Sequence, residues 1–202
     1  METNDTNISI ISMNSYISIA FMLFKFTEKI IVEQIRNGNL KAFEIIYKEY
    51  EERIYRFIYF RVPSKEIAQD LTSEIFIKVL DYLKNTETEI DNFCAFIYRV
   101  TRNLVNDFYR LKRITVSLDE VKEVILPSDM DIEEIAQRNL QIEKLREYFK
   151  KLPKDYLEPV LFHYFEGLSY RDIAEILSEK EANVKMRAHR GIKMLIGYLT
   201  NN

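Results

Sequence analysis

The chain has 202 residues, of which 47% are apolar, so it can bury one or two cores and is not compositionally disordered. Four glycines and four prolines are too few for the turns of a sheet protein, which favours an all-α fold. The net charge of -3 argues against a uniformly basic nucleic-acid coat, and two histidines with one cysteine argue against a structural zinc site. We expect no metal and no other cofactor.

Residues 1–26 fit poorly with the rest of the chain. The apolar run Ile19 to Phe24 is too short to cross a bilayer. Glu2 and Asp5 stand where a signal peptide would carry basic residues. We therefore interpret residues 1–26 as a loose extension. The single cysteine suits a reducing compartment, and we expect a cytoplasmic protein.

Three helices are predicted before residue 86. Helical spacing runs over Glu28 to Ile35 and over Leu40 to Phe60, with Asn37-Gly38 between them. A third helix begins after Pro63, with Ser64 as its N-cap. Its apolar face is formed by residues at helical spacing: Ile67, Leu71, Ile75, Val79 and Leu83. A polar loop, Asn85 to Asp91, follows.

The clearest predicted helix runs from Phe93 to Arg113 and is apolar on one side and basic on the other. The apolar arc comprises Phe93, Ile97, Val100, Leu104, Phe108 and Leu111. The opposite arc comprises Arg99, Arg102, Asn106, Arg110 and Arg113, flanked by Tyr98 and Tyr109. Such a face is most often only solvated, but acids are nearly absent from it. Cations along a phosphate backbone with aromatics for base stacking favour single-stranded nucleic acid as its ligand.

Residues Ile114 to Asp131 have no sustained period and are acidic, which predicts a linker. A second helical unit runs from Ile132 to Leu199. The fold class predicted is therefore all-α, with two small helical domains joined by an acidic linker.

Near the C-terminus, two helices in close succession predict a helix-turn-helix. Ser169 is the expected N-cap of the first, and Ser178-x-x-Glu181 has the pattern of a capping box that would start the second without a glycine turn. One face of the second helix is apolar, formed by Val184, Ala188, Ile192, Leu195 and Leu199. Asn183, Met186, Arg190 and Lys193 point away from that face, with His189 and Ala182 beside them. An ordinary helical hairpin is the alternative, but this outer face suits a DNA major groove.

Three stretches carry a family resemblance. AQDLTSEIF at 68–76, FCAFIYRVTRNLVNDFYRLKR at 93–113 and the segment from Leu152 to Leu195 occur in the order seen in bacterial RNA polymerase sigma factors of the sigma-70 family. The chain resembles the extracytoplasmic-function class of that family. The resemblance divides it into an extension (1–26), a region 2-like domain (27–113), an acidic linker (114–134) and a region 4-like helix-turn-helix domain (135–202).

The resemblance implies three sets of site residues. Asp70, Ser73 and Glu74 would contact the beta-prime clamp helices of core RNA polymerase, with Ser73 where the family usually has glutamine. The residues that would contact the melted -10 strand are Arg99, Arg102, Asn103, Asn106, Tyr109 and Arg110. The residues that would contact the -35 element are Asn183, Lys185, Met186, Arg187, His189, Arg190 and Lys193. The implied partners are core polymerase, promoter DNA and an anti-sigma factor, and the linker would run through the RNA exit path.

The sequence departs from the family pattern at four places. Phe96 replaces a tryptophan of the melting helix, and Glu87 with Glu89 makes the -10 capture loop acidic. Pro159 falls inside an expected helix, where it removes a backbone hydrogen bond. Residues 180–183, at the start of the reading helix, read KEAN where the family has SEGT. The promoter sequence therefore cannot be taken from a relative.

The function expected is a sigma factor that binds core polymerase and helps to open a promoter, and not an enzyme. No paired carboxylates, Ser/His arrangement or phosphate loop stands out. One alternative is a free-standing helix-turn-helix regulator, which would leave the segments at 68–76 and 93–113 unexplained. The other is a sigma relative that occupies polymerase without reading promoters.

The extension generates the first prediction. Residues 1–21 have no counterpart in the family pattern, so a chain that starts at Met22 should fold and transcribe like the full chain. Thermal unfolding and transcription with purified core polymerase measure both properties. A large loss in either one would give the segment a role.

Overall fold

The computed structural model describes residues 27–112 and 132–200. The sequence predictions for the extension at 1–26, for Arg113 and for the linker up to Asp131 lie outside the described residues. Within the described ranges the secondary structure is helical and contains no strand, which confirms the all-α prediction. None of the described helices is both long enough and apolar enough to traverse a bilayer.

The N-terminal half consists of a helix over residues 27–36 and three longer helices. These are α2 (Lys41–Tyr59), α3 (Lys65–Asn85) and α4 (Phe93–Lys112). As predicted, Ser64 caps α3, its hydroxyl accepting a hydrogen bond from the Ile67 amide at 3.3 Å. Asn92 caps α4 in the same way, accepting from the Ala95 amide at 3.2 Å.

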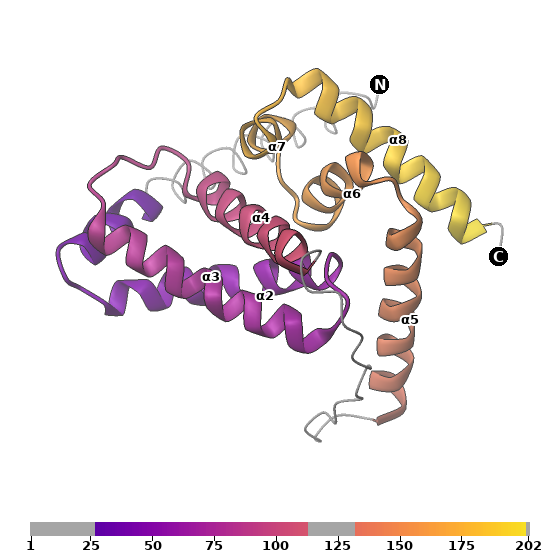
Figure 1. Ribbon diagram of the computed structural model, residues 1–202, viewed down its shortest axis with the longest axis horizontal. Coiled ribbons are helices and arrows are strands. Elements are labelled where there is room, and N and C mark those ends of the chain that lie inside the picture. The colour runs from indigo at the N-terminus through magenta and orange to yellow at the C-terminus, as the bar shows by residue number, and fades with distance from the viewer. Residues whose placement is uncertain (1–26, 113–131, 201–202) are drawn as a thin grey trace, which may run out of the picture.

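The C-terminal half comprises four α-helices and one π-helical turn. They are α5 (Ile132–Lys151), α6 (Lys154–Val160), the π-helical turn η1 (Leu161–Phe165), α7 (Tyr170–Leu177) and α8 (Glu181–Thr200). Because α5 begins at Ile132, the last three residues of the predicted linker are helical. Figure 1 shows α4 at the centre, with α2 and α3 on one side and α6 and α7 on the other.

Packing on both sides changes which face of α4 is buried. Tyr98 is wholly buried and does not border an open stripe, so its predicted place was wrong. Leu111, expected on the apolar arc, is 61% exposed. The apolar arc in the sequence predicts the contact with α2 and α3, but not the second contact with the C-terminal half. Phe162 of η1 and Glu166, from that half, contact Tyr98.

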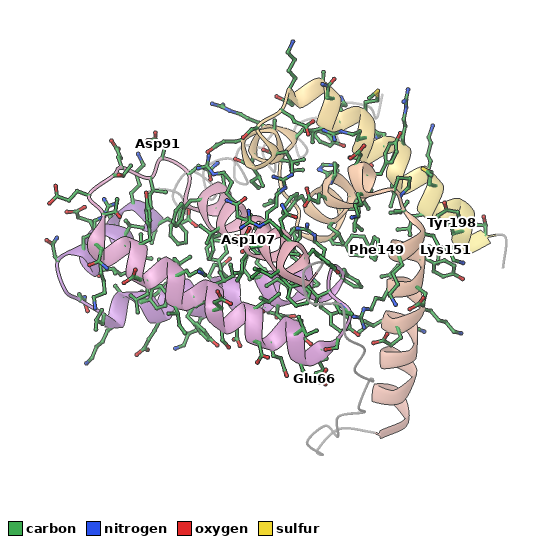
Figure 2. All side chains as sticks on the ribbon, viewed as in Figure 1. Glu66, Asp91, Asp107, Phe149, Lys151 and Tyr198 are labelled. Carbon is green, nitrogen blue, oxygen red and sulfur yellow. The ribbon has the colours of Figure 1, made fainter. Side chains whose placement is uncertain are left out.

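Aromatic rings join the two halves. Phe162 of η1 stacks on Phe57 of α2 with 4.6 Å between ring centroids, and it meets the edge of Tyr98 at 5.3 Å. Phe149 of α5 packs against Phe60 at 4.9 Å, and Figure 2 shows Phe149 on the side of α5 that faces the rest of the molecule. Aromatic pairs of this kind each add about 0.5–1.5 kcal/mol beyond the burial of their area.

Pro159 lies inside α6, as expected, and is followed by the π-helical turn η1. Proline lacks an amide hydrogen and its ring crowds the carbonyl one turn earlier, so the regular ladder is disturbed there. In η1 the Glu166 amide donates to the Leu161 carbonyl at 3.0 Å, a bond that spans five residues. The proline and the wide turn together direct Phe162 and Glu166 toward α2 and α4.

The turn between α7 and α8 differs from the predicted capping box. Ser178 does not cap α8, which begins at Glu181. It adopts a left-handed conformation (φ 56°) just after α7, the position where glycine is usual. The Glu179 amide donates to the Ala174 carbonyl at 2.9 Å, as in a Schellman motif. Serine therefore occupies the glycine position directly, at a cost in backbone strain.

Gly191 sets how closely α8 approaches α6. A Cβ atom at this position would lie 2.5 Å from a methyl carbon of Val160 and 3.2 Å from the carbonyl oxygen of Tyr156. Any larger residue would therefore push the two helices apart. Gly197, also in α8, has open space around it.

These two glycines form a matched pair. Gly191→Ala should lower the free energy of unfolding by about 1–3 kcal/mol, because the added methyl overpacks the contact with α6. Gly197→Ala should raise it by about 0.5–1 kcal/mol, because alanine loses less backbone entropy in a helix. Urea unfolding of both variants checks this, and equal effects would contradict the close approach at Gly191.

Candidate polymerase and nucleic-acid interfaces

The first candidate interface lies on α3. Asp70, Ser73 and Glu74 are all exposed, on the side of the helix opposite the buried Leu71 and Ile75. The Ser73 hydroxyl donates to the Gln69 carbonyl at 3.1 Å. Its short side chain is thus engaged with its own helix.

Ile77 extends this surface and was missed by sequence reasoning. It is 68% exposed and lies three residues after Glu74 and four after Ser73, so it shares their face of α3. Its neighbours Ile75 and Phe76 are both buried, and the three consecutive apolar residues looked alike in the sequence. An exposed apolar side chain bordered by polar ones is compatible with a protein-binding surface, in which an apolar core is surrounded by a polar rim.

The second candidate interface is the basic side of α4. Figure 2 shows Asp107 on this helix, and Asp107 pairs with Arg110 at 3.1 Å. Asn106 accepts a hydrogen bond from Arg61 at 3.2 Å, and the Tyr109 hydroxyl donates to the Arg61 carbonyl. These contacts hold the C-terminal end of the stripe against the loop before α3.

The middle of that stripe faces acids from the other half of the chain. Arg99 lies 3.6 Å from a carboxylate oxygen of Glu175, and Arg102 lies 2.9 Å from one of Glu158. Asn103, between them in sequence, is exposed. The structure therefore places all six expected -10 residues on one helix and engages two of its arginines across the domain boundary.

The loop Asn85 to Asp91, expected to capture a -10 base, is tied to the first helix. Lys29 lies 3.3 Å from Glu89 and 3.2 Å from Asp91, which Figure 2 places just before α4. Arg36 donates to the Thr88 carbonyl. Two cations thus offset part of the loop's acidity.

The third candidate interface is the outer face of α8. Its buried side is formed by Val184, Ala188, Gly191 and Leu195. Six of the seven expected -35 residues are exposed on the other side: Asn183, Lys185, Met186, His189, Arg190 and Lys193. Arg187 is the exception, because it turns inward and pairs with Glu179.

Aromatic side chains from η1 and α7 support this face. Lys185 lies over the ring of Tyr170 at 5.9 Å, and the Tyr164 hydroxyl lies 3.4 Å from Nδ1 of His189. His163 stacks on Tyr170 with 4.0 Å between centroids. The sequence run from Phe162 to Tyr170 is rich in aromatics, a signal that could have pointed to this support.

The one cysteine has no reactive character. Cys94 lies half-buried at the start of α4, and burial raises the pKa of its thiol to about 12. The thiol therefore stays protonated at neutral pH and is a poor nucleophile. Among the described residues, no group of three or more His, Cys, Asp or Glu side chains is arranged to hold a metal ion.

Each half of the chain matches a known protein-family model. Residues 46–114 match sigma-70 region 2, and residues 142–195 match sigma-70 region 4. The chain is 31% identical over 150 residues to the RNA polymerase sigma factor SigZ of Bacillus subtilis, covering 73% of this chain and 81% of SigZ. This chain belongs to the RNA polymerase sigma factors.

Two further similarities agree with that membership. This sigma factor is 27% identical over 178 residues to the ECF RNA polymerase sigma factor BldN of Streptomyces coelicolor, covering 85% of this chain and 66% of BldN, just under two thirds of its length. A solved structure of CnrH in complex with the cytosolic domain of CnrY superposes with a TM-score of 0.67, 18% identity and coverage of 87% of this chain and 99% of CnrH. The latter is similar in fold.

The α3 surface generates a prediction for polymerase binding. Changing Asp70 and Glu74 to Lys should weaken association with core polymerase by about 100-fold or more, because two acids that would meet the partner become cations. Glu44 and Glu51 of α2 provide a control with the same change in net charge. Affinity measured by biolayer interferometry should fall only for the α3 pair. Equal binding by both double variants would place the polymerase contact elsewhere.

Proposed function

We propose that this sigma factor binds core RNA polymerase through α3, holds the melted -10 strand along α4 and reads duplex -35 DNA with α8. One observation carries the proposal. The chain contains regions 2 and 4 in family order, and each presents an exposed polar face of the composition its target needs.

At the -10 element the proposed contacts are made by cations and amides. Arg99, Arg102 and Arg110 follow the phosphates, while Asn103 and Asn106 reach base edges. Tyr109, which is 41% exposed, is the aromatic of this set on which a base can stack. Tyr98 is not part of the proposed contact because it is buried.

At the -35 element the proposed readers lie in the middle of α8. Arg190 is exposed and suits bidentate contact with a guanine, while Asn183 suits adenine. Lys185 and Lys193 would contact phosphates. Arg187 supports the turn through Glu179 and is the weakest candidate of the expected set for a base contact.

The remaining parts of the proposal concern setting and partners. The protein would act in the cytoplasm as a binding subunit and not as an enzyme. A restraining anti-sigma factor would be a further partner. The solved CnrH structure holds a second protein, but its 18% identity supports only the fold.

In vitro transcription tests the function directly. Purified core polymerase with this protein should start transcripts from a subset of a randomised promoter library, and core polymerase alone should not. Specific binding to duplex DNA without polymerase would favour a free-standing regulator. Polymerase binding without promoter-dependent transcripts would favour a relative that has lost promoter reading.

Two variants of α8 separate base reading from phosphate contact. Arg190→Ala should cost about 1–3 kcal/mol and change the preferred bases at one or two -35 positions. Lys185→Ala should weaken all promoters evenly and reduce the salt dependence by about one phosphate contact. The promoter-library ranking is the measurement, with Lys144→Ala on α5 as an exposed control. An unchanged ranking with Arg190→Ala would remove α8 from base reading.

A further inference from the structure

A carboxylate from the C-terminal half is buried among cations of the N-terminal half. Glu166 follows η1, and its side chain is 1% exposed. Arg56 donates to it from Nε at 2.9 Å and from Nη2 at 3.0 Å, and Nε of Arg53 lies 3.6 Å away. The Tyr98 hydroxyl donates at 2.9 Å. All of these partners belong to α2 and α4.

Tyr98 is held in the donor form that this contact requires. Burial raises the pKa of Tyr98 well above its usual value, and the adjacent charge of Glu166 raises it further. Its hydroxyl therefore keeps its proton throughout the physiological range. Glu166 thus receives hydrogen bonds from two side chains that remain donors.

Further acids of the same half face the expected -10 residues. Glu158 of α6 bridges Arg61 at 2.8 Å and Arg102 at 2.9 Å. Glu175 of α7 pairs with Arg99 at 3.6 Å and accepts a hydrogen bond from Asn92 at 3.1 Å. The C-terminal half therefore places carboxylates where a nucleic-acid strand would place phosphates.

The arrangement covers only one of the three candidate interfaces. Asp70 and Glu74 of α3 are exposed, and so are Arg190 and Lys193 of α8. Arg99 and Arg102 are engaged by acids. A closed chain can therefore meet polymerase and duplex DNA while its strand-binding helix is occupied.

Geometry requires that this state open during promoter recognition. The -10 and -35 elements lie about 25 base pairs apart, or roughly 85 Å along B-DNA. Here α4 contacts α7, and α7 packs against α8, a 20-residue helix that is about 30 Å long. The two reading helices are therefore too close together to reach both elements at once.

A cavity borders the interface between the halves. A cavity of about 620 Å³ lies beside the Glu158 pair, lined among others by Arg61, Arg110, Lys154 and Arg187. Nη1 of Arg61 is buried there without a hydrogen-bond partner in the described structure. A strand phosphate that entered the cavity would find these cations beside Asp155, Glu158 and Glu179, so it would compete there with carboxylates.

We propose that the acidic face of α6, η1 and α7, formed by Glu158, Glu166 and Glu175, is a binding surface for the chain's own -10 helix, on which it takes the place of promoter single strand. The closed chain binds polymerase first, and the melted strand then competes with these carboxylates for Arg99 and Arg102. Glu166 is the latch, because it is the buried member of the set. The identity of the competitor rests on the proposed function.

Glu166→Gln tests the latch, with Glu52→Gln as its matched control. Both acids pair with Arg56, but Glu52 does so on the surface of α2, within the N-terminal half. Fluorophores on Lys84→Cys and Lys180→Cys would report the distance between the halves. Cys94→Ser in every labelled protein leaves these two cysteines as the thiols that react.

Glu166→Gln should lengthen the distance between the labels and tighten binding of single-stranded oligo(dT) by about tenfold, since the strand-competent fraction rises. Glu52→Gln should change neither. If Glu166→Gln loses helical circular dichroism, Glu158→Gln serves as the test variant instead. It should lengthen the label distance and tighten oligo(dT) binding by smaller amounts than expected for Glu166→Gln. An unchanged distance and unchanged strand affinity in the folded variant would overturn the latch.

Two readouts keep this proposal separate from the proposed function. Core polymerase affinity should be equal for the wild type and for Glu166→Gln, because the α3 surface is exposed in both states. If the label distance responds but neither protein supports transcription with core polymerase, the latch stands and the proposed function fails. If both proteins transcribe but the distance does not respond, the latch alone fails.

Discussion

The arrangement of the two halves depends on how the carboxylate of Glu166 is removed from water. Burying a charged carboxylate costs several kcal/mol, and the cost is offset only when opposite charge and hydrogen bonds surround it with good geometry. Arg56 supplies two donors, Tyr98 a third, and Arg53 a second positive charge. A shifted or rotated C-terminal half would leave this charge buried and unmatched, so the contact specifies one orientation.

Apolar contacts beside Glu166 help its ion pair to specify the orientation of the two halves. Phe162 stacks on Phe57 and meets Tyr98, which keeps water away from the ion pair. Both Phe162 and Glu166 reach the N-terminal half because η1 follows Pro159 and changes the direction of the chain. A residue that breaks a local helix rule thus positions the contact that joins the halves.

Burial also ranks the ion pairs between the halves. Arg99 and Glu175 are each more than 40% exposed, so their pair contributes about 0–1 kcal/mol and is weakened by salt. Glu158 is only 13% exposed, and Glu166 is 1% exposed. Opening is therefore controlled mainly by Glu166 and next by the partly buried Glu158, while Arg99 exchanges its partner easily. The Arg99 pair is the most exposed of the three contacts between acids of the C-terminal half and arginines of α2 and α4.

Local features of the fold were predictable from sequence, and contacts between distant segments were not. Ser64 and Ser169 each accept a hydrogen bond from the amide three residues later, so these N-caps depend only on local sequence, and both predictions are confirmed. Tyr98 and Arg187 were placed wrongly or incompletely, because their partners come from another helix or from the preceding turn. The prediction that Ser178 caps α8 was wrong, because the sequence does not distinguish a serine in a left-handed conformation from a serine N-cap.

The contacts between acids of the C-terminal half and the arginines of α2 and α4 also bear on non-specific DNA binding by a chain whose net charge is -3. Non-specific binding to DNA grows with the number of phosphates that a protein can neutralise, and a cell offers a large excess of such sites. A free stripe of arginines on α4 would hold the chain on any exposed strand. Carboxylates from α6 and α7 reduce the number of available cations until promoter and polymerase together compete for them. Three of the chain's 32 acids, Glu158, Glu166 and Glu175, therefore lie where they lower non-specific affinity, and the α8 face stays open for sequence reading.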